Sequence, residues 1–188
     1  MFMRKIVAVI GDAKIEKPSL KYDVAFQTGK LLVDNGFRVQ SGGHSGVMEA
    51  AFAGAHSSEK YREGDTIAIL PGWKADNGNP WGDICIPTGL DLYRNAIVAG
   101  ASAVIAVGGG AGTLSEIAFA WTYRRLLIAY DCVDGWSAKV AGTKLDNKFR
   151  YSFDDEIFAA STPEQAIKIL TEKLPLYTAE YTGIRFGE

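Results

Sequence analysis

The chain reads Ala103-Val-Ile-Ala-Val107-Gly-Gly-Gly-Ala-Gly-Thr113 at its most informative point, where an apolar segment runs into a glycine-rich loop. Every residue from 103 to 107 is apolar, which is typical of a strand at the centre of a parallel sheet with helices on both faces. A helical spacing of apolar residues follows over residues 113 to 124. A glycine loop between strand and helix lets backbone amides approach a ligand, and the helix start adds unpaired N–H groups. The stretch predicts an anion-binding loop at residues 108 to 113.

Short apolar segments alternate with longer amphipathic ones along the rest of the chain. This alternation predicts βα units that feed a parallel sheet, and so a three-layer, Rossmann-like α/β fold with a mostly parallel central sheet. We expect strands at residues 6 to 10, 38 to 40, 66 to 70, 84 to 86, 103 to 107 and 126 to 130, with helices at 20 to 35, 45 to 56, 90 to 101 and 113 to 124.

The C-terminal third is less regular. Residues 131 to 155 show no clear period, whereas Thr162 and Pro163 predict the cap and first turn of a last helix that ends near residue 174. The length of 188 residues and the hydrophobic content of 47% suit one core. We therefore expect a single Rossmann-like domain over residues 1 to 175, followed by a tail at 176 to 188.

Composition limits the classes of partner. Cys85 and Cys132 stand alone, which favours reduced thiols over a disulfide or a metal site. No apolar run approaches the length of a membrane span, and the first apolar run, residues 6 to 10, is too short for the hydrophobic region of a signal peptide. The net charge of −2 is scattered and gives no basic stripe for nucleic acid. We expect a cytoplasmic protein with no membrane or nucleic-acid partner and no metal.

A second glycine-rich loop, Gln40-Ser-Gly-Gly-His-Ser-Gly-Val-Met48, also lies between a predicted strand and a helix. In a parallel sheet such loops emerge at the carboxyl edge, so both should border one cleft with the end of the first strand. Alternatively, the glycines serve only tight turns and packing, and His44 only bonds to backbone. The predicted phosphate-binding residues are Gly11, Gly42, Gly43, His44, Ser45, Gly46, Gly108, Gly109, Gly110, Gly112 and Thr113.

Several common sites are disfavoured. The last position of a GxGxxG pattern counted from Gly108 is Thr113, and no acidic residue follows the second strand to bind a ribose. A Walker lysine is also missing, and the two histidines form no Ser-His-Asp arrangement. Ordinary NAD enzymes, ATPases and triad hydrolases are therefore not expected.

Glu116 and Arg94 have two interpretations each. Thr113-Leu-Ser-Glu116 fits a capping box, in which both side chains bond to helix-end amides. A carboxylate near a bound phosphate could instead recognise the sugar or ring of the ligand. Arg94 could complete this site or be a solvated charge on a helix.

Together these residues resemble the LOG-like superfamily, long mislabelled as possible lysine decarboxylases, and within it the branch of the molybdenum cofactor carrier proteins. The resemblance covers roughly residues 5 to 130 and rests on several motifs in order. They are Ala8-Val-Ile-Gly11, Ser41-Gly-Gly-His-Ser-Gly-Val-Met-Glu-Ala-Ala51, Ile69-Leu-Pro-Gly72, Ile86-Pro-Thr-Gly89, Arg94-Asn95 and Val107-Gly-Gly-Gly-Ala-Gly-Thr-Leu-Ser-Glu116.

The resemblance implies roles for single residues. In the cytokinin-activating members, PGGxGTxxE supplies phosphate-binding amides and a catalytic glutamate, and an upstream arginine completes the site. These roles would fall on Gly109, Gly110, Gly112, Thr113, Glu116 and Arg94. Here Val107-Gly108 replaces the Pro-Gly opening, and Asn95 stands where the hydrolases carry lysine. These departures agree better with the carrier-like branch than with hydrolysis.

Three hypotheses follow. The leading one is a carrier or storage protein for a phosphorylated nucleotide-like or pterin cofactor, including the molybdenum cofactor. The alternative is a nucleoside 5′-monophosphate phosphoribohydrolase in which Glu116 and Arg94 are catalytic, and the third is a structural oligomer with a vestigial site. Because related proteins associate through helices near the site and this chain is rich in aromatic residues, we expect a homo-oligomer, a dimer or tetramer.

Overall fold

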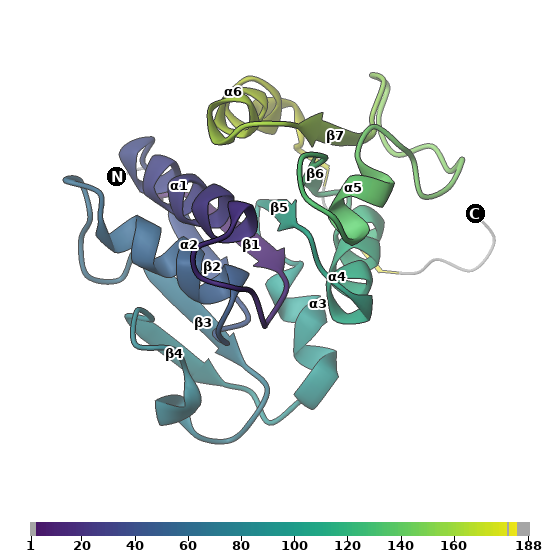
Figure 1. Ribbon diagram of the computed structural model, residues 1–188. Helices are drawn as coiled ribbons and strands as arrows, with labels where there is room; N and C mark the ends of the chain where they lie inside the picture. Colours follow the sequence, from purple (N-terminus) through teal and green to yellow (C-terminus); the bar gives the residue numbers. More distant parts are fainter. Residues whose placement is uncertain (1–2, 180, 184–188) are drawn as a thin grey trace.

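The computed structural model describes residues 3 to 179 and 181 to 183. Seven strands form one sheet in the order β4-β3-β2-β1-β5-β6-β7, and every pair of neighbours is parallel (Figure 1). The predicted three-layer α/β fold with a Rossmann-like parallel sheet is confirmed. The strands are β1 (Ile6–Gly11), β2 (Arg38–Ser41), β3 (Thr66–Leu70), β4 (Ile84–Pro87), β5 (Ala103–Val107), β6 (Leu126–Tyr130) and β7 (Ile157–Ala160).

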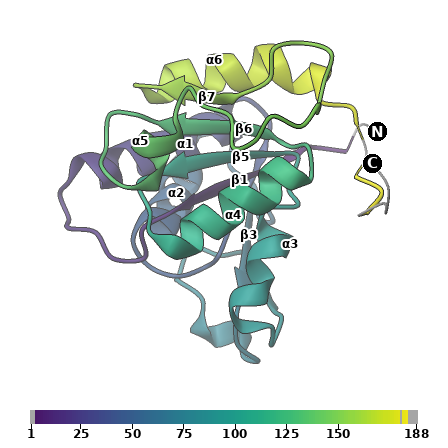
Figure 2. The same cartoon turned by 90° about the vertical axis from the view of Figure 1, so that its right-hand side faces the viewer.

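Helices cover both faces of the sheet (Figures 1 and 2). One face packs against α1 (Leu20–Asp34), α2 (Val47–His56) and α6 (Pro163–Lys173). The other packs against α3 (Asn95–Val98), α4 (Ala111–Thr122) and α5 (Trp136–Val140). Short 3₁₀ helices complete the elements: η1 (Ala75–Asn77), η2 (Asp91–Arg94) and η3 (Leu174–Leu176).

The strand order positions the site. From β1 the chain moves outward through β2, β3 and β4, and it then returns to add β5, β6 and β7 on the opposite side of β1. The loops after β1 and β5 therefore leave the sheet side by side and diverge, which is where open α/β sheets bind ligands. Gly11 pairs with Val107 at this point, and a Cβ on Gly11 would lie 2.2 Å from the Val107 carbonyl oxygen. Only glycine fits there.

Two segments differ from the sequence predictions. The helix expected over residues 90 to 101 is instead the 3₁₀ helix η2 followed by the single turn α3. The peptide N–H groups of Gly89 and Asp91 bond to the loop after β3, and Asp91 has a φ of 49°, so the chain cannot enter a regular helix there. Strand β7, at the edge of the sheet opposite β4, was not predicted.

Helix α6 begins at the predicted cap, and the described part of the tail after it packs against the domain. The Thr162 hydroxyl accepts a hydrogen bond from the Gln165 amide, which confirms the predicted cap. In the tail, the Tyr177 hydroxyl donates to Asp155, and the Tyr181 ring packs on Tyr123. Residues 180 and 184 to 188 of the predicted tail lie outside the described residues. Within the described part of the chain, no helix has the length and apolar character needed to cross a membrane.

Candidate functional site

The glycine loop after β5 is fixed by its own hydrogen bonds. Gly108 and Gly109 have φ values of 66° and 98°, a conformation that favours glycine. Their amides donate to Ser137 Oγ (2.7 Å) and Asp12 Oδ2 (2.9 Å), and their carbonyl oxygens accept from the Ser137 and Trp136 amides. The first two glycines thus shape the loop, and their N–H groups are already bonded.

The amides that remain for a ligand begin one residue later. Helix α4 starts at Ala111 with Gly110 as N-cap, so the first-turn N–H groups have no partner within the helix. Gly110 has an extended conformation, and a Cβ on it would meet no atom within 4 Å. A Cβ on Gly112 would be 4.0 Å from its nearest neighbour, Asn95 Nδ2. The face of residues 110 to 112 is therefore open, whereas Thr113 is buried.

The second glycine loop, after β2, serves mainly packing. Gly43 and Gly46 have positive φ values, and a Cβ on either would collide, with Leu70 and with the Asp12 carbonyl oxygen respectively. Ser45 Oγ donates to the Ala13 carbonyl oxygen at 2.7 Å. For Gly43 and Gly46 the structure thus supports the alternative interpretation, in which the glycines serve tight turns and packing. The loop lies at the carboxyl edge of the sheet, directly after β2, as the edge rule predicts.

Arg94 and Glu116 form a buried ion pair beside this loop. Arg94 Nη1 lies 3.3 Å from Glu116 Oε1, and the two residues are only 8% and 6% exposed. Arg94 Nε has no hydrogen-bond partner among the described residues. A Cβ on Gly42 would lie 2.2 Å from Arg94 Nη1, so the glycine lets the guanidinium lie against the backbone. The structure thus brings together Gly42, Arg94 and Glu116, three residues far apart in the sequence.

These positions correct two expectations. Glu116 is not part of a capping box, because α4 begins two residues before Thr113 and Gly110 makes no side-chain cap. Arg94 is not a solvated helix charge, because it is buried against Glu116. The helix begins early because the glycine loop, held by Trp136 and Ser137, already gives the chain an extended entry at Gly110.

Burial controls the protonation of this pair. Loss of solvent raises the pKa of Glu116 to about 7, and the positive charge of Arg94 opposes that rise. Burial also lowers the pKa of Arg94. Half-buried His44 has a lowered pKa because of desolvation and then the nearby Arg94 charge. Its carbonyl oxygen accepts from Asn79 Nδ2. The site thus holds an acid that is half protonated near neutral pH.

Asp12 and Lys21 support the glycine loop and escaped the sequence analysis. Asp12 Oδ2 accepts from both Gly109 N–H and Lys21 Nζ (2.7 Å). Burial opposes the charge of Lys21, but hydrogen bonds to Asp12 and Asp134 outweigh it and raise the pKa of the lysine. Asn95 Nδ2 donates to Ser115 Oγ on α4 at 2.9 Å. Asp12 could have been found from its position, because it directly follows Gly11 at the end of β1, on the edge of the sheet where the site lies.

Comparison with known proteins assigns the chain to a family. The model of the SLOG cluster4 family matches residues 4 to 167. The chain belongs to the SLOG cluster4 family.

Relatives of this SLOG cluster4 chain include proteins with named functions. The molybdenum cofactor binding protein of Rippkaea orientalis has a TM-score of 0.75 and 32% identity, with 92% of this chain and 98% of that chain covered. The molybdenum cofactor carrier protein of Chlamydomonas reinhardtii has a TM-score of 0.72 and 26% identity, with 92% and 99% covered. The resemblance to the LOG-like superfamily and its molybdenum cofactor carrier branch is confirmed.

A third relative is an enzyme. The cytokinin riboside 5′-monophosphate phosphoribohydrolase LOG of rice, Oryza sativa subsp. japonica, is 30% identical over 127 residues, which are 65% of this chain and 50% of that protein. The match thus spans half the length of the rice enzyme.

Proposed function

We propose that this protein is a cytoplasmic carrier or storage protein for a phosphorylated heterocyclic cofactor of the molybdenum cofactor type. The phosphate would bind the amides of residues 110 to 113 at the start of α4. The observation that carries the proposal is the open face of Gly110 and Gly112 beside unpaired helix-start amides. The names of the relatives from Rippkaea and Chlamydomonas support the class of ligand.

The second candidate function is phosphoribohydrolase activity on a nucleoside 5′-monophosphate. The Arg94–Glu116 pair favours it, because a carboxyl with a pKa near 7 suits a general acid or base. The rice relative carries this activity in its name. We place it second because of the residue after Arg94. The hydrolases that this chain resembles carry a lysine at this position, whereas this chain has Asn95, whose side chain donates a hydrogen bond to Ser115 of α4.

The ligand itself provides the first test. Freshly purified protein, denatured and analysed by mass spectrometry, should release a phosphorylated heterocycle in an amount that approaches one per chain. Protein dialysed extensively against phosphate before denaturation is the control, and it should release much less because phosphate competes for the same amides. A structural oligomer with a vestigial site would release nothing from either sample.

We also propose that the protein is a homodimer that uses the surface around η2 and α3. The edge strand β4 exposes Ile84 and Ile86 by 44% and 43%, while Leu92 and Tyr93 are exposed by 72% and 81%. In Figure 2 this part of the chain extends away from the layer formed by α4 and α5. An apolar surface of this kind is typical of an interface.

Light scattering of the wild-type protein at micromolar concentration should therefore give the mass of two chains. The Leu92→Lys variant should give the mass of one chain. Leu20→Lys, a change of another exposed leucine on the α1 side, is the matched control and should stay dimeric. A monomeric wild-type protein would refute the proposal.

A further inference from the structure

The open start of α4 and the buried Glu116 lie on one face of the helix. Gly112 and Glu116 are four residues apart, a spacing that places their side-chain positions about 5 to 6 Å from each other on the helix surface. Gly112 is exposed, whereas Glu116 is buried. An anion bound over Gly112 would therefore lie within about one helical turn of the Glu116 carboxyl group.

The junction of η2 and α3 contacts both of these positions. The Asn95 side chain donates to the Gly112 carbonyl oxygen (3.4 Å) and to Ser115 Oγ (2.9 Å), so this junction is held against the first turn of α4. The preceding residue, Arg94, places its Nη1 3.3 Å from Glu116 Oε1. A single cation thus stands beside the carboxyl group and close to the start of the helix.

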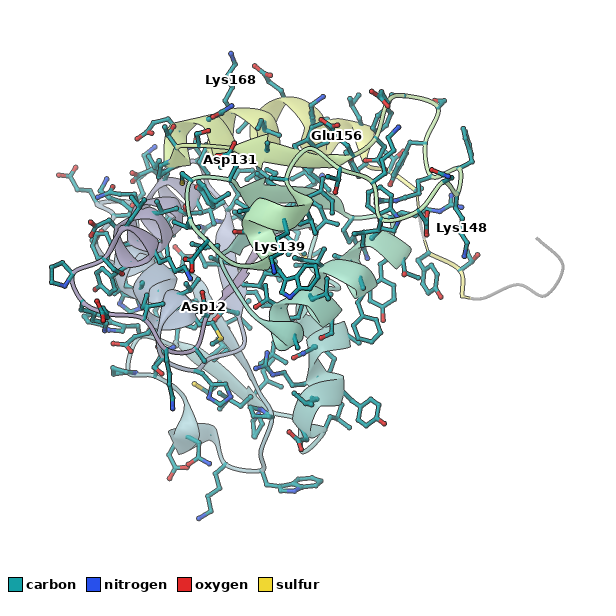
Figure 3. All side chains as sticks on the ribbon, turned by 45° about the vertical axis from the view of Figure 1, so that its right-hand side comes forward. Asp12, Asp131, Lys139, Lys148, Glu156 and Lys168 are labelled. Atoms are coloured by element: carbon teal, nitrogen blue, oxygen red, sulfur yellow. The ribbon has the colours of Figure 1, made fainter. Side chains whose placement is uncertain are left out.

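The other elements around Glu116 contribute little charge. The helices and strands that pack most closely against α4 are α3, α5, β1, β5 and β6. Their only charged residue is Lys139 of α5 (labelled in Figure 3), whose ammonium group lies over the Trp136 ring. Glu116 is the only charged residue of α4 itself. Its charge is therefore balanced by Arg94.

The neighbouring loops add three titratable groups. His44, in the loop after β2, is close to Arg94, and desolvation together with the Arg94 charge holds the pKa of the imidazole below its ordinary value of 6.5. It is therefore neutral above pH 7. Asp12 and Lys21 form an ion pair of 2.7 Å beside Gly108, so their charges offset each other.

We propose that the site binds its anion together with a proton, which Glu116 takes up, so that the affinity for the anion falls as pH rises. A second negative charge beside a buried carboxylate favours the protonated form of the carboxyl group, because like charges at this separation repel. The single positive charge of Arg94 cannot neutralise both. The inference rests on the proposed function, since it takes the start of α4 as the anion site, and it adds how binding and release are controlled.

The pH range follows from where Glu116 ionises. Burial raises the pKa of Glu116 to about 7 in the ligand-free protein, and the Arg94 charge opposes this rise. A bound anion raises the pKa further. Well below pH 7 the carboxyl group is protonated in both states, so the affinity is constant. As pH rises between the two pKa values, binding must take up a proton and the affinity falls. At pH 7 itself the loss is only about twofold.

Calorimetric titration with sulfate tests the inference, because sulfate stays a dianion over this range, whereas a phosphate ester has a second pKa of about 6. The dissociation constant of the wild-type protein should rise about 10-fold between pH 6 and pH 9. Titrations at pH 7.5 in two buffers of different ionisation enthalpy should show the uptake of about half a proton per sulfate. GMP should show the same trend between pH 7 and pH 9.

Three variants assign the proton to its residue. Glu116→Gln should bind sulfate with constant affinity over the whole range and without proton uptake. Glu156→Gln is the matched control, because it makes the same change at a glutamate that directly precedes β7 (labelled in Figure 3), and it should keep the wild-type pH dependence. His44→Asn should keep this pH dependence as well.

The outcomes separate the two proposals. A wild-type affinity that is constant with pH, with no proton uptake, would overturn the inference and leave the anion site intact. A pH dependence that persists in Glu116→Gln would also overturn it, because another group would then hold the proton. If neither sulfate nor GMP binds at any of these pH values, the proposed function fails, and the inference fails with it.

Discussion

Replacing Gly110 with valine is expected to weaken the binding of a nucleoside monophosphate by about 100-fold or more while the protein stays folded. The conformation of Gly110 is extended, so a β-branched residue is allowed, and its Cβ would point into open space where the phosphate must approach. Losing two charge-assisted hydrogen bonds at about 1.5 kcal/mol each gives this factor. Calorimetric titration with GMP measures it.

The stability cost of Gly110→Val should be small, because a poor N-cap residue costs about 1 kcal/mol. Gly72→Val is the matched control: a Cβ on Gly72, which follows β3 at the same edge of the sheet, would be 3.9 Å from its nearest neighbour, and affinity should not change. Gly109 is unsuitable, since its φ is 98° and a Cβ would collide with Thr113. Wild-type affinity in Gly110→Val would show that the ligand does not use these amides.

The glycine loop could be anticipated only in part. A glycine loop before a helix predicts unpaired amides at the helix start, because that inference needs only a strand, a turn and a helix start. Ligand binding there stays a prediction, and the amides of Gly108 and Gly109, which were also predicted to bind the ligand, bond within the protein. The same pattern could not reveal which glycines are structural. Gly108 and Gly109 adopt positive φ and bond to Ser137 and Asp12, whereas Gly110 is extended. These differences come from contacts with distant parts of the chain.

For the fold as well, local patterns predicted some elements, while elements that depend on contacts with distant parts of the chain were missed. The strands β3, β5 and β6 have the predicted bounds, since each is a short, fully buried apolar run covered on both faces. The segment around η2 misled because Leu90, Tyr93 and Ile97 stand at helical spacing, although all three are exposed. Strand β7 was missed because its four residues follow an irregular segment, and only pairing with β6 identifies it.

Glu116→Gln should make the protein more stable than wild type at pH 8, by up to about 3 kcal/mol, and about equally stable at pH 4, below the pKa of both states. The folded protein holds the Glu116 proton up to a pKa of about 7, whereas the unfolded chain releases it near the ordinary value of 4.5. The folded state thus binds more protons between these values, so the stability of the wild type falls as pH rises through them. Glutamine mimics the protonated form and removes this loss. Urea unfolding at both pH values measures the difference.

The same variant separates the carrier from the enzyme. If the protein is a carrier, neither wild type nor Glu116→Gln should release free base from AMP or GMP, and both should bind GMP with similar affinity because the phosphate contacts remain. If Glu116 is the acid or base of a phosphoribohydrolase, wild type should release the base, and Glu116→Gln should lower the rate by about 100-fold or more. The rate should then change with pH near 7, since the carboxyl ionises there. Chromatographic detection of the free base decides between the two functions. A carrier can keep the buried Arg94–Glu116 pair for structure alone, whereas only in an enzyme does the Glu116→Gln change reduce the rate of base release.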